Sequence, residues 1–237
     1  YGQTGGNMIR VSNKKIETPI ILEENAPLLL VVENPAEYYR LTEEFIKAFE
    51  GAESEFSFWN GTESFKPSDG GELVYNLFSF NAADKKIISL LYKKLYAEYL
   101  GGDFMLSFNE LNGAAERFLL SLTETSDIRL EYDLPTVEGL LKLFAVRPIK
   151  EGETLLEKLI SYVNIFTELK NASFFVFAGL KSVLSDNELK EFYKHCALAK
   201  VSLLVIEPFL KRPIDKIERA IIITEDLCEI VENIHCE

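Results

Sequence analysis

The stretch SFFVFAGLKSVLSDNELKEFYKHCALAKVSLLVIEP, residues 173–208, constrains the fold of this 237-residue chain more than any other. Two short apolar runs, residues 174–177 and 203–206, are bounded by turn residues and do not alternate with polar ones. Such runs are typical of strands that are covered on both faces of a parallel sheet. Between them Ser185 begins a run with helical spacing, and Glu188 completes a capping box. The stretch therefore predicts a strand, a helix and a second strand.

A second unit of the same kind lies near the start of the chain. Residues 28–32 (LLLVV) predict a buried strand, and residues 35–49 predict a helix. Asn34 is a typical N-cap, Pro35 stands in the first helical position, and Glu37 lies in the first turn. Two such units predict an α/β protein with a mainly parallel sheet.

Nucleotide-binding proteins use this scaffold, but the chain lacks their phosphate loop. Such a loop needs glycines, whose backbone N–H groups wrap the phosphates, and a lysine. After its strands this chain has ENPAEYYR and AGLKSVLSDNE, and neither fits G-x-x-x-x-G-K-[ST]. The expected caps also occupy the N–H groups that would bind an anion. Glu207 follows the strand LLVI, as a magnesium-binding acid does in nucleotide hydrolases, but a carboxylate at the end of a buried strand is the simpler interpretation. We expect no catalytic site.

The middle of the chain has helical periodicity instead. Helices are expected in ADKKIISLLYKKLYAEYL, SFNELNGAAERFLLSLTE and GETLLEKLISYVNIFTELK. In the first, apolar side chains share one face at 100° per residue. The opposite face is expected to carry Lys85, Lys86, Lys93 and Lys94. The pattern predicts a discontinuous α/β head over residues 8–81 and 171–237, with an α-helical insert over residues 82–170. Residues 1–7 (YGQTGGN) resemble a remnant of cloning.

Carboxylates concentrate in SDIRLEYDLPTVEG, which contains Asp127, Glu131, Asp133 and Glu138. Acids at alternating positions can supply the oxygen ligands that calcium takes, although the EF-hand pattern is absent. A solvated polar loop fits the same residues. Two His-Cys pairs, at 195–196 and 235–236, could suggest zinc, but zinc ligands usually stand two to four residues apart.

Composition restricts the partners and the cellular location that we expect for this chain. The net charge of −13 argues against general attraction to nucleic acid, although screening over about 10 Å leaves room for a local basic patch. No run of 18 apolar residues predicts a membrane span. Three cysteines favour a reducing, cytoplasmic location without a disulfide framework.

The order of these segments resembles one known family. A short N-terminal sheet is followed by the helical insert with LEYD, then by FFVFAGLKSVLSDNELKEFYKHCALAKVSLLVIEP and a last strand, AIIITED. This layout is similar to the CRISPR-associated DNA-end-binding adaptation proteins of type II-A systems, and the similarity extends from Met8 to Glu232. That family has a head that resembles a degenerate P-loop NTPase.

The resemblance implies a specific function. It implies a homotetrameric ring that binds double-stranded DNA ends, is stabilised by calcium and supports spacer acquisition in bacteria, beside other CRISPR adaptation proteins and the effector nuclease. Its calcium ligands would be Asp127, Glu131 and Asp133, although Arg129 departs from the family's acidic run. The DNA-binding residues would be Lys85, Lys86, Lys93 and Lys94, with Lys14 and Lys15 in the first hairpin turn as a second set.

Two alternatives stay open on sequence alone. The chain could be a nucleotide hydrolase with an atypical phosphate site, or an acidic adaptor that binds only protein. Lysine pairs on a helix are most often plain solvated faces, so the DNA-binding interpretation depends on the resemblance.

Overall fold

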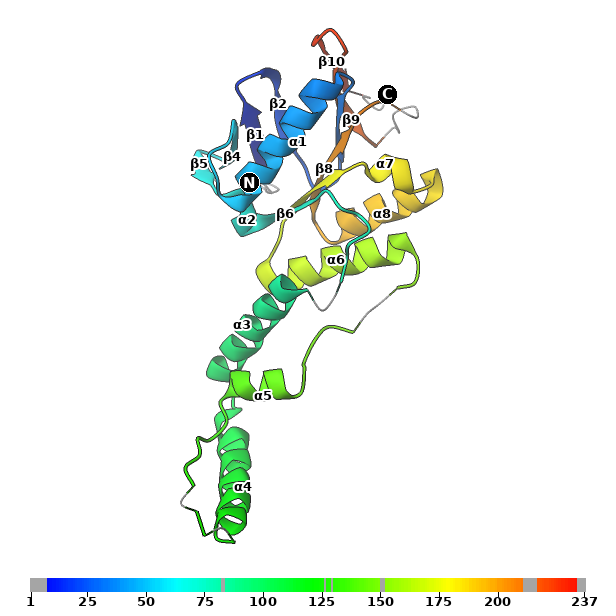
Figure 1. Ribbon diagram of the computed structural model, residues 1–237. Coiled ribbons are helices and arrows are strands. Elements are labelled where there is room, and N and C mark those ends of the chain that lie inside the picture. The colour runs from blue at the N-terminus through cyan, green and yellow to red at the C-terminus, as the bar shows by residue number, and fades with distance from the viewer. Residues whose placement is uncertain are drawn as a thin grey trace, which may run out of the picture. The chain divides into compact units, whose positions relative to one another are not determined.

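The computed structural model describes residues 8–81, 84–125, 127–128, 130–149, 152–210 and 217–233. The chain divides into two compact units (Figure 1). The head unit comprises Tyr1–Phe80 and Glu151–Glu237, and the helical unit comprises Asn81–Lys150. The supposed cloning remnant, residues 1–7, lies outside the described residues.

A six-stranded sheet forms the centre of the head unit, with the strand order β10-β9-β3-β8-β7-β6. All neighbouring pairs are parallel except β10, which runs antiparallel to β9. This confirms the prediction of an α/β fold with a mainly parallel sheet. The strands are β3 (Leu28–Val32), β6 (Gly71–Val74), β7 (Phe174–Ala178), β8 (Ser202–Glu207), β9 (Arg219–Ile223) and β10 (Glu229–Asn233).

Helices cover both faces of this sheet, which explains why its central strands show no alternation. Every residue of β3, β7 and β8 is buried. On one face, Leu30 belongs to the same core as Phe45 of α1 (Pro35–Glu50). On the other face, the ring of Phe177 packs 5.3 Å from that of Phe192 in α8 (Asp186–Leu198). Two short helices, α2 (Pro67–Gly70) and α7 (Leu180–Val183), also belong to the head unit.

A second, antiparallel sheet shares the core beneath α1. Its order is β2 (Ile16–Leu22), β1 (Ile9–Asn13), β4 (Phe56–Asn60) and β5 (Glu63–Phe65). Buried and less buried positions alternate in β1, as expected for a sheet with one covered face. The ring of Phe56 stacks 3.9 Å from that of Phe45. The carboxylate of Glu229 in β10 accepts the backbone N–H groups of Glu17 and Thr18 at 2.7 and 2.9 Å, which ties this sheet to the larger one.

Helix α6 (Leu155–Lys170) belongs to the head unit, whereas sequence spacing assigned it to the insert. Its last residue, Lys170, donates to the carboxylate of Glu72 in β6 at 2.5 Å and to the backbone carbonyl of Gly71 at 2.8 Å. Tyr162 packs its ring 6.2 Å from that of Phe175. Helical periodicity shows that a helix has an apolar face, but it does not show which neighbour covers that face.

The helical unit consists of α3 (Lys85–Gly101), α4 (Met105–Thr123) and α5 (Val137–Leu143). Asp84 caps α3 by accepting the backbone N–H of Lys86 at 2.7 Å. Helix α5 was not predicted, because it is only seven residues long and its first three residues lie within the acidic segment that was interpreted as a loop. Its cap is Thr136, whose hydroxyl oxygen accepts the N–H of Gly139 at 3.0 Å.

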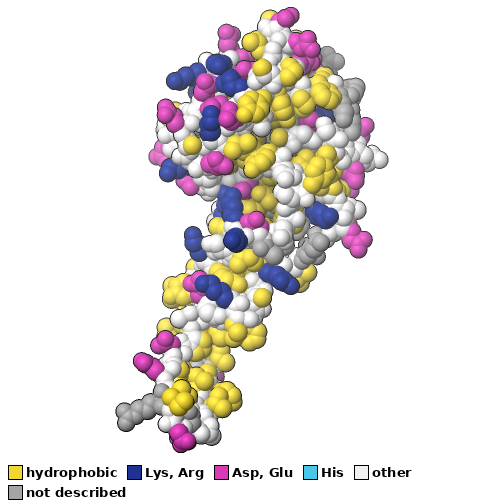
Figure 2. All heavy atoms as spheres, in the orientation of Figure 1, with side chains coloured by type: hydrophobic (Ala, Val, Ile, Leu, Met, Phe, Trp, Pro, Cys, Tyr) yellow, Lys and Arg dark blue, Asp and Glu magenta, His cyan; other side chains and the backbone are white. Residues whose placement is uncertain are grey.

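This unit has almost no core of its own. Among its described residues only Ile87 is buried, and α4 has no buried residue at all. Leu106 and Phe118 of α4 are 71% and 65% exposed. Figure 2 shows hydrophobic side chains at the surface of these helices. None of the described helices is both long enough and apolar enough to span a bilayer.

Candidate functional site

The carboxyl edge of the parallel sheet is where proteins of this architecture hold phosphates. Here β3 and α1 are joined only by Glu33 and Asn34. The side-chain oxygen of Asn34 accepts the N–H groups of Ala36 and Glu37, both at 3.1 Å, and its amide donates to the carbonyl of Glu225 at 3.0 Å. A connection of two residues cannot wrap a phosphate, and its cap already occupies two of the helix's free donors.

Glu207 lies beside this connection, since it pairs with Val31 across β8 and β3. Its carboxylate is buried and accepts the backbone N–H of Lys181 at 2.6 Å and the hydroxyl of Ser182 at 3.3 Å. The carboxylate thus anchors the first turn of α7 to β8. This agrees with the structural interpretation of Glu207 rather than with a magnesium ligand.

A buried ionic cluster surrounds the same region. Lys181 donates to both carboxylate oxygens of Glu218, at 2.9 and 2.7 Å, and the hydroxyl of Tyr193 donates to the same carboxylate at 2.8 Å. Burial, together with the negative charge of Glu218, raises the pKa of Tyr193 well above its ordinary value. No pattern in the sequence predicts this cluster, because its members are distant in the chain and match no spacing rule.

The four lysines of α3 differ in whether they line the groove beside this helix. Lys85 and Lys93 line a groove together with the apolar residue Ile88. Lys86 and Lys94 are not among the residues that line it, and Lys94 lies 4.0 Å from Glu98. The second predicted set, Lys14 and Lys15, is exposed in the β1–β2 turn of the head unit.

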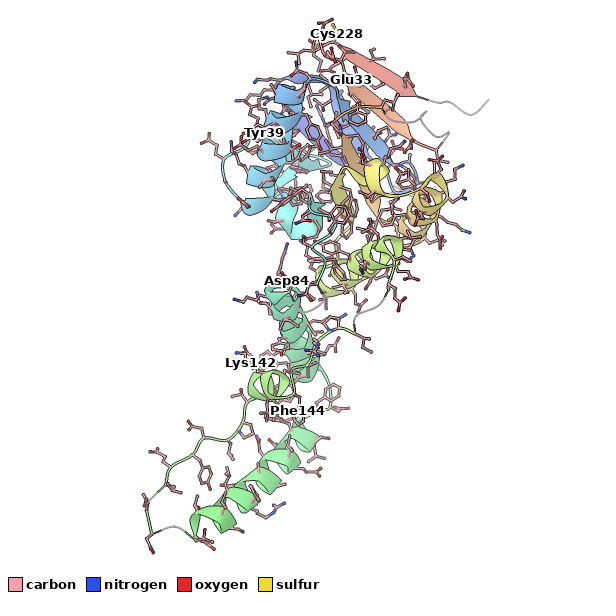
Figure 3. The ribbon with its side chains drawn as sticks, turned by 45° about the vertical axis from the view of Figure 1, so that its right-hand side comes forward. Glu33, Tyr39, Asp84, Lys142, Phe144 and Cys228 are labelled. Atoms are coloured by element: carbon pink, nitrogen blue, oxygen red, sulfur yellow. The ribbon has the colours of Figure 1, made fainter. Side chains whose placement is uncertain are left out.

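The groove lies within the helical unit, between α3 and α5 with the segment that follows α5. Its volume is about 720 Å³. The hydroxyl of Tyr92 donates to the carbonyl of Leu141 at 3.0 Å, which fixes that ring against α5. Lys142, labelled in Figure 3, is paired with Glu138 at 2.8 Å. The lining residues are Lys85, Ile88, Ser89, Tyr92, Lys93, Tyr96, Glu138, Lys142, Ala145, Val146 and Arg147.

The candidate calcium ligands are not gathered into a site within one chain. Asp127, Glu131 and Asp133 are all exposed, and the described residues contain no group of three or more histidine, cysteine or acidic side chains able to hold a metal ion. Calcium takes about six to eight oxygen ligands. These residues alone therefore do not fit a calcium ion, and backbone carbonyls or another copy would have to complete the shell. Arg129 lies outside the described residues.

Within the described residues, the histidine–cysteine pairs do not form a metal site either. His195 contacts the side-chain oxygen of Asn164 at 2.8 Å through its Nε2. Cys196 is buried, and burial raises its pKa to about 12, which disfavours the thiolate that zinc requires. The second pair, His235 and Cys236, lies outside the described residues.

Comparison with known proteins identifies a family. The model of the Cas_Csn2 family, described as CRISPR-associated protein, matches residues 48–227. A protein named CRISPR-associated protein Csn2 from Streptococcus agalactiae is 23% identical over 211 residues, covering 85% of this chain and 90% of that protein.

Two solved structures match most of this chain at low sequence identity. An ATP-binding cassette of an ABC transporter in its ADP conformation has a TM-score of 0.46 and 14% identity, with 92% of this chain and 88% of that chain covered. An ABC transporter ATP-binding protein from Pyrococcus furiosus has a TM-score of 0.41 and 10% identity, with 90% and 96% covered.

Proposed function

The chain belongs to the Cas_Csn2 family of CRISPR-associated proteins, which act in CRISPR adaptation, and we propose that it binds the ends of double-stranded DNA without sequence preference and without catalysis. The observation that carries this proposal is the family match over residues 48–227, three quarters of the chain. The proposed working form is a homotetrameric ring that acts beside other CRISPR adaptation proteins and the effector nuclease.

The carboxyl edge of the sheet supports a role without nucleotide hydrolysis. The two residues between β3 and α1 leave no loop for phosphates, and the carboxylate of Glu207 is bonded to the turn that begins α7. General acid–base or metal-assisted chemistry needs polar groups that converge on a reacting atom. Here the converging polar groups, Lys181, Glu218 and Tyr193, are buried and satisfy one another.

The helical unit supports assembly and DNA binding. Monomeric proteins rarely expose many large apolar side chains together, so helices without buried residues favour contact with further copies. A closed ring would repeat the lysines of α3 in every subunit. Such repetition reconciles DNA binding with a chain of net charge −13, because only the lining of the ring needs to be basic.

Titration of duplex DNA tests this proposal. We expect the parent protein to bind a linear duplex but not the same sequence closed into a circle, and to lose affinity steeply as salt rises, with a log–log slope of about −0.9 per neutralised phosphate. Reversing Lys86 and Lys93 to Glu should weaken binding to all duplexes alike and flatten that slope. A matched control reverses Lys66 and Lys194, two exposed lysines of the head unit.

The mass of the protein in solution tests the ring separately. The parent and the Lys86→Glu/Lys93→Glu variant should both have the mass of four chains, since the reversal is meant to change the charge of the lining and not the assembly. Equal affinity of this variant and the parent at every salt concentration would refute the role of α3. A monomeric parent would refute the ring.

Calcium is part of the proposal, with ligands drawn from Asp127, Glu131 and Asp133. What supports it is the resemblance to the type II-A adaptation family and the concentration of carboxylates in one segment. A ligand that binds only the folded state adds about 2.7 kcal/mol at a hundredfold excess over its dissociation constant. Calcium should therefore raise the melting temperature of the parent but not of Glu131→Ala/Asp133→Ala. The same melting temperature with calcium and with a chelator in the parent would exclude this part.

A further inference from the structure

The groove of the helical unit combines cations with aromatic rings. Lys85, Lys93 and Arg147 line it, and none of these three has an acidic partner among the described residues. Tyr96 is 47% exposed beside them. In a chain with 38 acidic residues, three uncompensated cations around one hollow make it a local site for anions.

The shape and chemistry of the groove point to nucleotides. Its volume of about 720 Å³ lies in the range of small-molecule sites, which run from about 300 to 1,000 Å³. Ile88 and Val146 give it apolar walls, and the ring of Tyr92 is held in place by its bond to Leu141. Exposed aromatic rings next to cations are the usual means of holding unpaired bases, because each base stacks on a ring while cations hold the phosphates.

We propose that this groove binds unpaired nucleotides, namely the single-stranded tail or frayed terminus of a DNA end. The proposal deepens the proposed function and rests on it, because it assigns a site for the end of the DNA that the ring would hold. Tyr96 and Tyr92 contact the bases, and Lys85, Lys93 and Arg147 contact the phosphates. Stacking on the rings distinguishes the end of a duplex from its interior, where the bases are paired and covered.

An acidic peptide of a partner protein is the rival occupant. Single-stranded nucleic acid is favoured because the cations stand around tyrosine side chains, and each base offers a flat face of the size of those rings. An acidic peptide would use the cations but would need an aromatic side chain of its own to use Tyr96. The rival is therefore included in the test as a competitor.

The experiment compares two duplexes of the same paired sequence, one blunt and one with a four-nucleotide tail, by fluorescence anisotropy. We expect the parent to bind the tailed duplex about tenfold more tightly, since stacking of one base is worth about that much. Tyr96→Leu should reduce the ratio of the two affinities at least threefold. The matched control is Tyr39→Leu, which changes another exposed helical tyrosine, 68% exposed in the head unit, and should leave both affinities unchanged.

A second measurement does not depend on affinity. A tail that contains 5-iodouracil should crosslink under ultraviolet light to Tyr92 or Tyr96, as mapped by mass spectrometry. Equal affinities for blunt and tailed duplexes, or crosslinks only outside the groove, would overturn the inference and leave the proposed function standing. Displacement of the tail by an acidic tyrosine-containing peptide, but not by a single-stranded oligonucleotide, would assign the groove to a protein and also overturn it. Failure to bind either duplex would overturn both this inference and the proposed function.

Discussion

At the scale of single residues, the buried pair of Lys181 and Glu218 is the most sensitive point of the head unit. A buried ion pair adds little over well-packed apolar residues, but removing one partner leaves an uncompensated charge. The two side chains come from different segments of the chain, so their contact holds α7 to the beginning of β9. Their separation in sequence is the reason why no spacing rule could reveal them.

Lys181→Met is therefore expected to lower the free energy of unfolding by about 3–5 kcal/mol, because the carboxylate of Glu218 loses its buried partner. The double variant Lys181→Met/Glu218→Leu should recover a large part of that loss, since no buried charge remains. Urea unfolding of the two variants and the parent measures this difference. A double variant that is less stable than Lys181→Met would show that the pair is strongly stabilising in itself.

Tyr193, a member of the same cluster, is expected to make the free energy of unfolding depend on pH. Its pKa is raised by burial and by Glu218, so the folded protein keeps the phenol proton that the unfolded chain releases near pH 10. The folded state then binds more protons, and the free energy of unfolding falls as pH rises above about 10. Tyr193→Phe should make that fall shallower, whereas Tyr39→Phe, which changes an exposed ring, should not. Identical slopes in all three proteins between pH 9 and 11 would contradict the assignment.

At the scale of elements, the sequence predicted those parts whose signals are local. The bounds of β3 are those predicted, and both Asn34 and Ser185 cap the helices that they were expected to cap. Strands β7 and β8 were predicted because their buried central residues, 174–177 and 203–206, form continuous apolar runs. The family resemblance was confirmed because it depends on the order of such segments.

The elements that were missed lack those signals. Strand β6 has four residues, two of which are Gly71 and Glu72, and the buried carboxylate of Glu72 is paired with Lys170 from a distant segment. Helix α5 is short, and β10 is an edge strand rich in acidic residues. The groove could not be predicted either, because it depends on how α3 packs against α5 and not on the face pattern of either helix.

The connection between β3 and α1 leads to a prediction about nucleotide binding. Millimolar magnesium–ATP should not raise the melting temperature of the parent, because the two connecting residues offer no phosphate site. Asn34→Ala should cost about 0.5–2 kcal/mol through loss of the cap, without creating affinity for ATP. Calorimetric unfolding with and without the nucleotide measures both effects. ATP turnover that disappears in Glu207→Gln would refute the assignment.

At the scale of the whole molecule, the two units differ in how much of their own surface they bury. The head unit encloses a core of aromatic and aliphatic side chains, whereas the helical unit buries only Ile87 among its described residues. Helices without a covered face gain little from isolated folding, so most of their stability has to come from packing against something else.

Protection of α4 against hydrogen exchange should therefore depend on protein concentration. We expect amides of residues 105–123 to exchange faster on dilution below the dissociation constant of the assembly, while those of residues 35–50, which cover the head core, keep their protection. Phe118→Glu should lower the mass in solution and abolish this dependence. Tyr39→Glu, an equally exposed site in the head unit, is its control. Concentration-independent protection of α4 would show that the helical unit is stable alone.

The short connection between β3 and α1 also limits which changes of function are open to this protein during evolution. Exchanging one amino acid for another alters the side chains at Glu33 and Asn34, but it adds no backbone N–H groups with which to surround an anion. A nucleotide cradle would require an insertion of several residues between β3 and α1, together with the loss of the Asn34 cap and of the Glu207 carboxylate that anchors α7. Each of those steps is harmful before the last is complete. Under the proposed function, substitutions at that edge of the sheet would be constrained by the stability of the fold and not by nucleotide turnover.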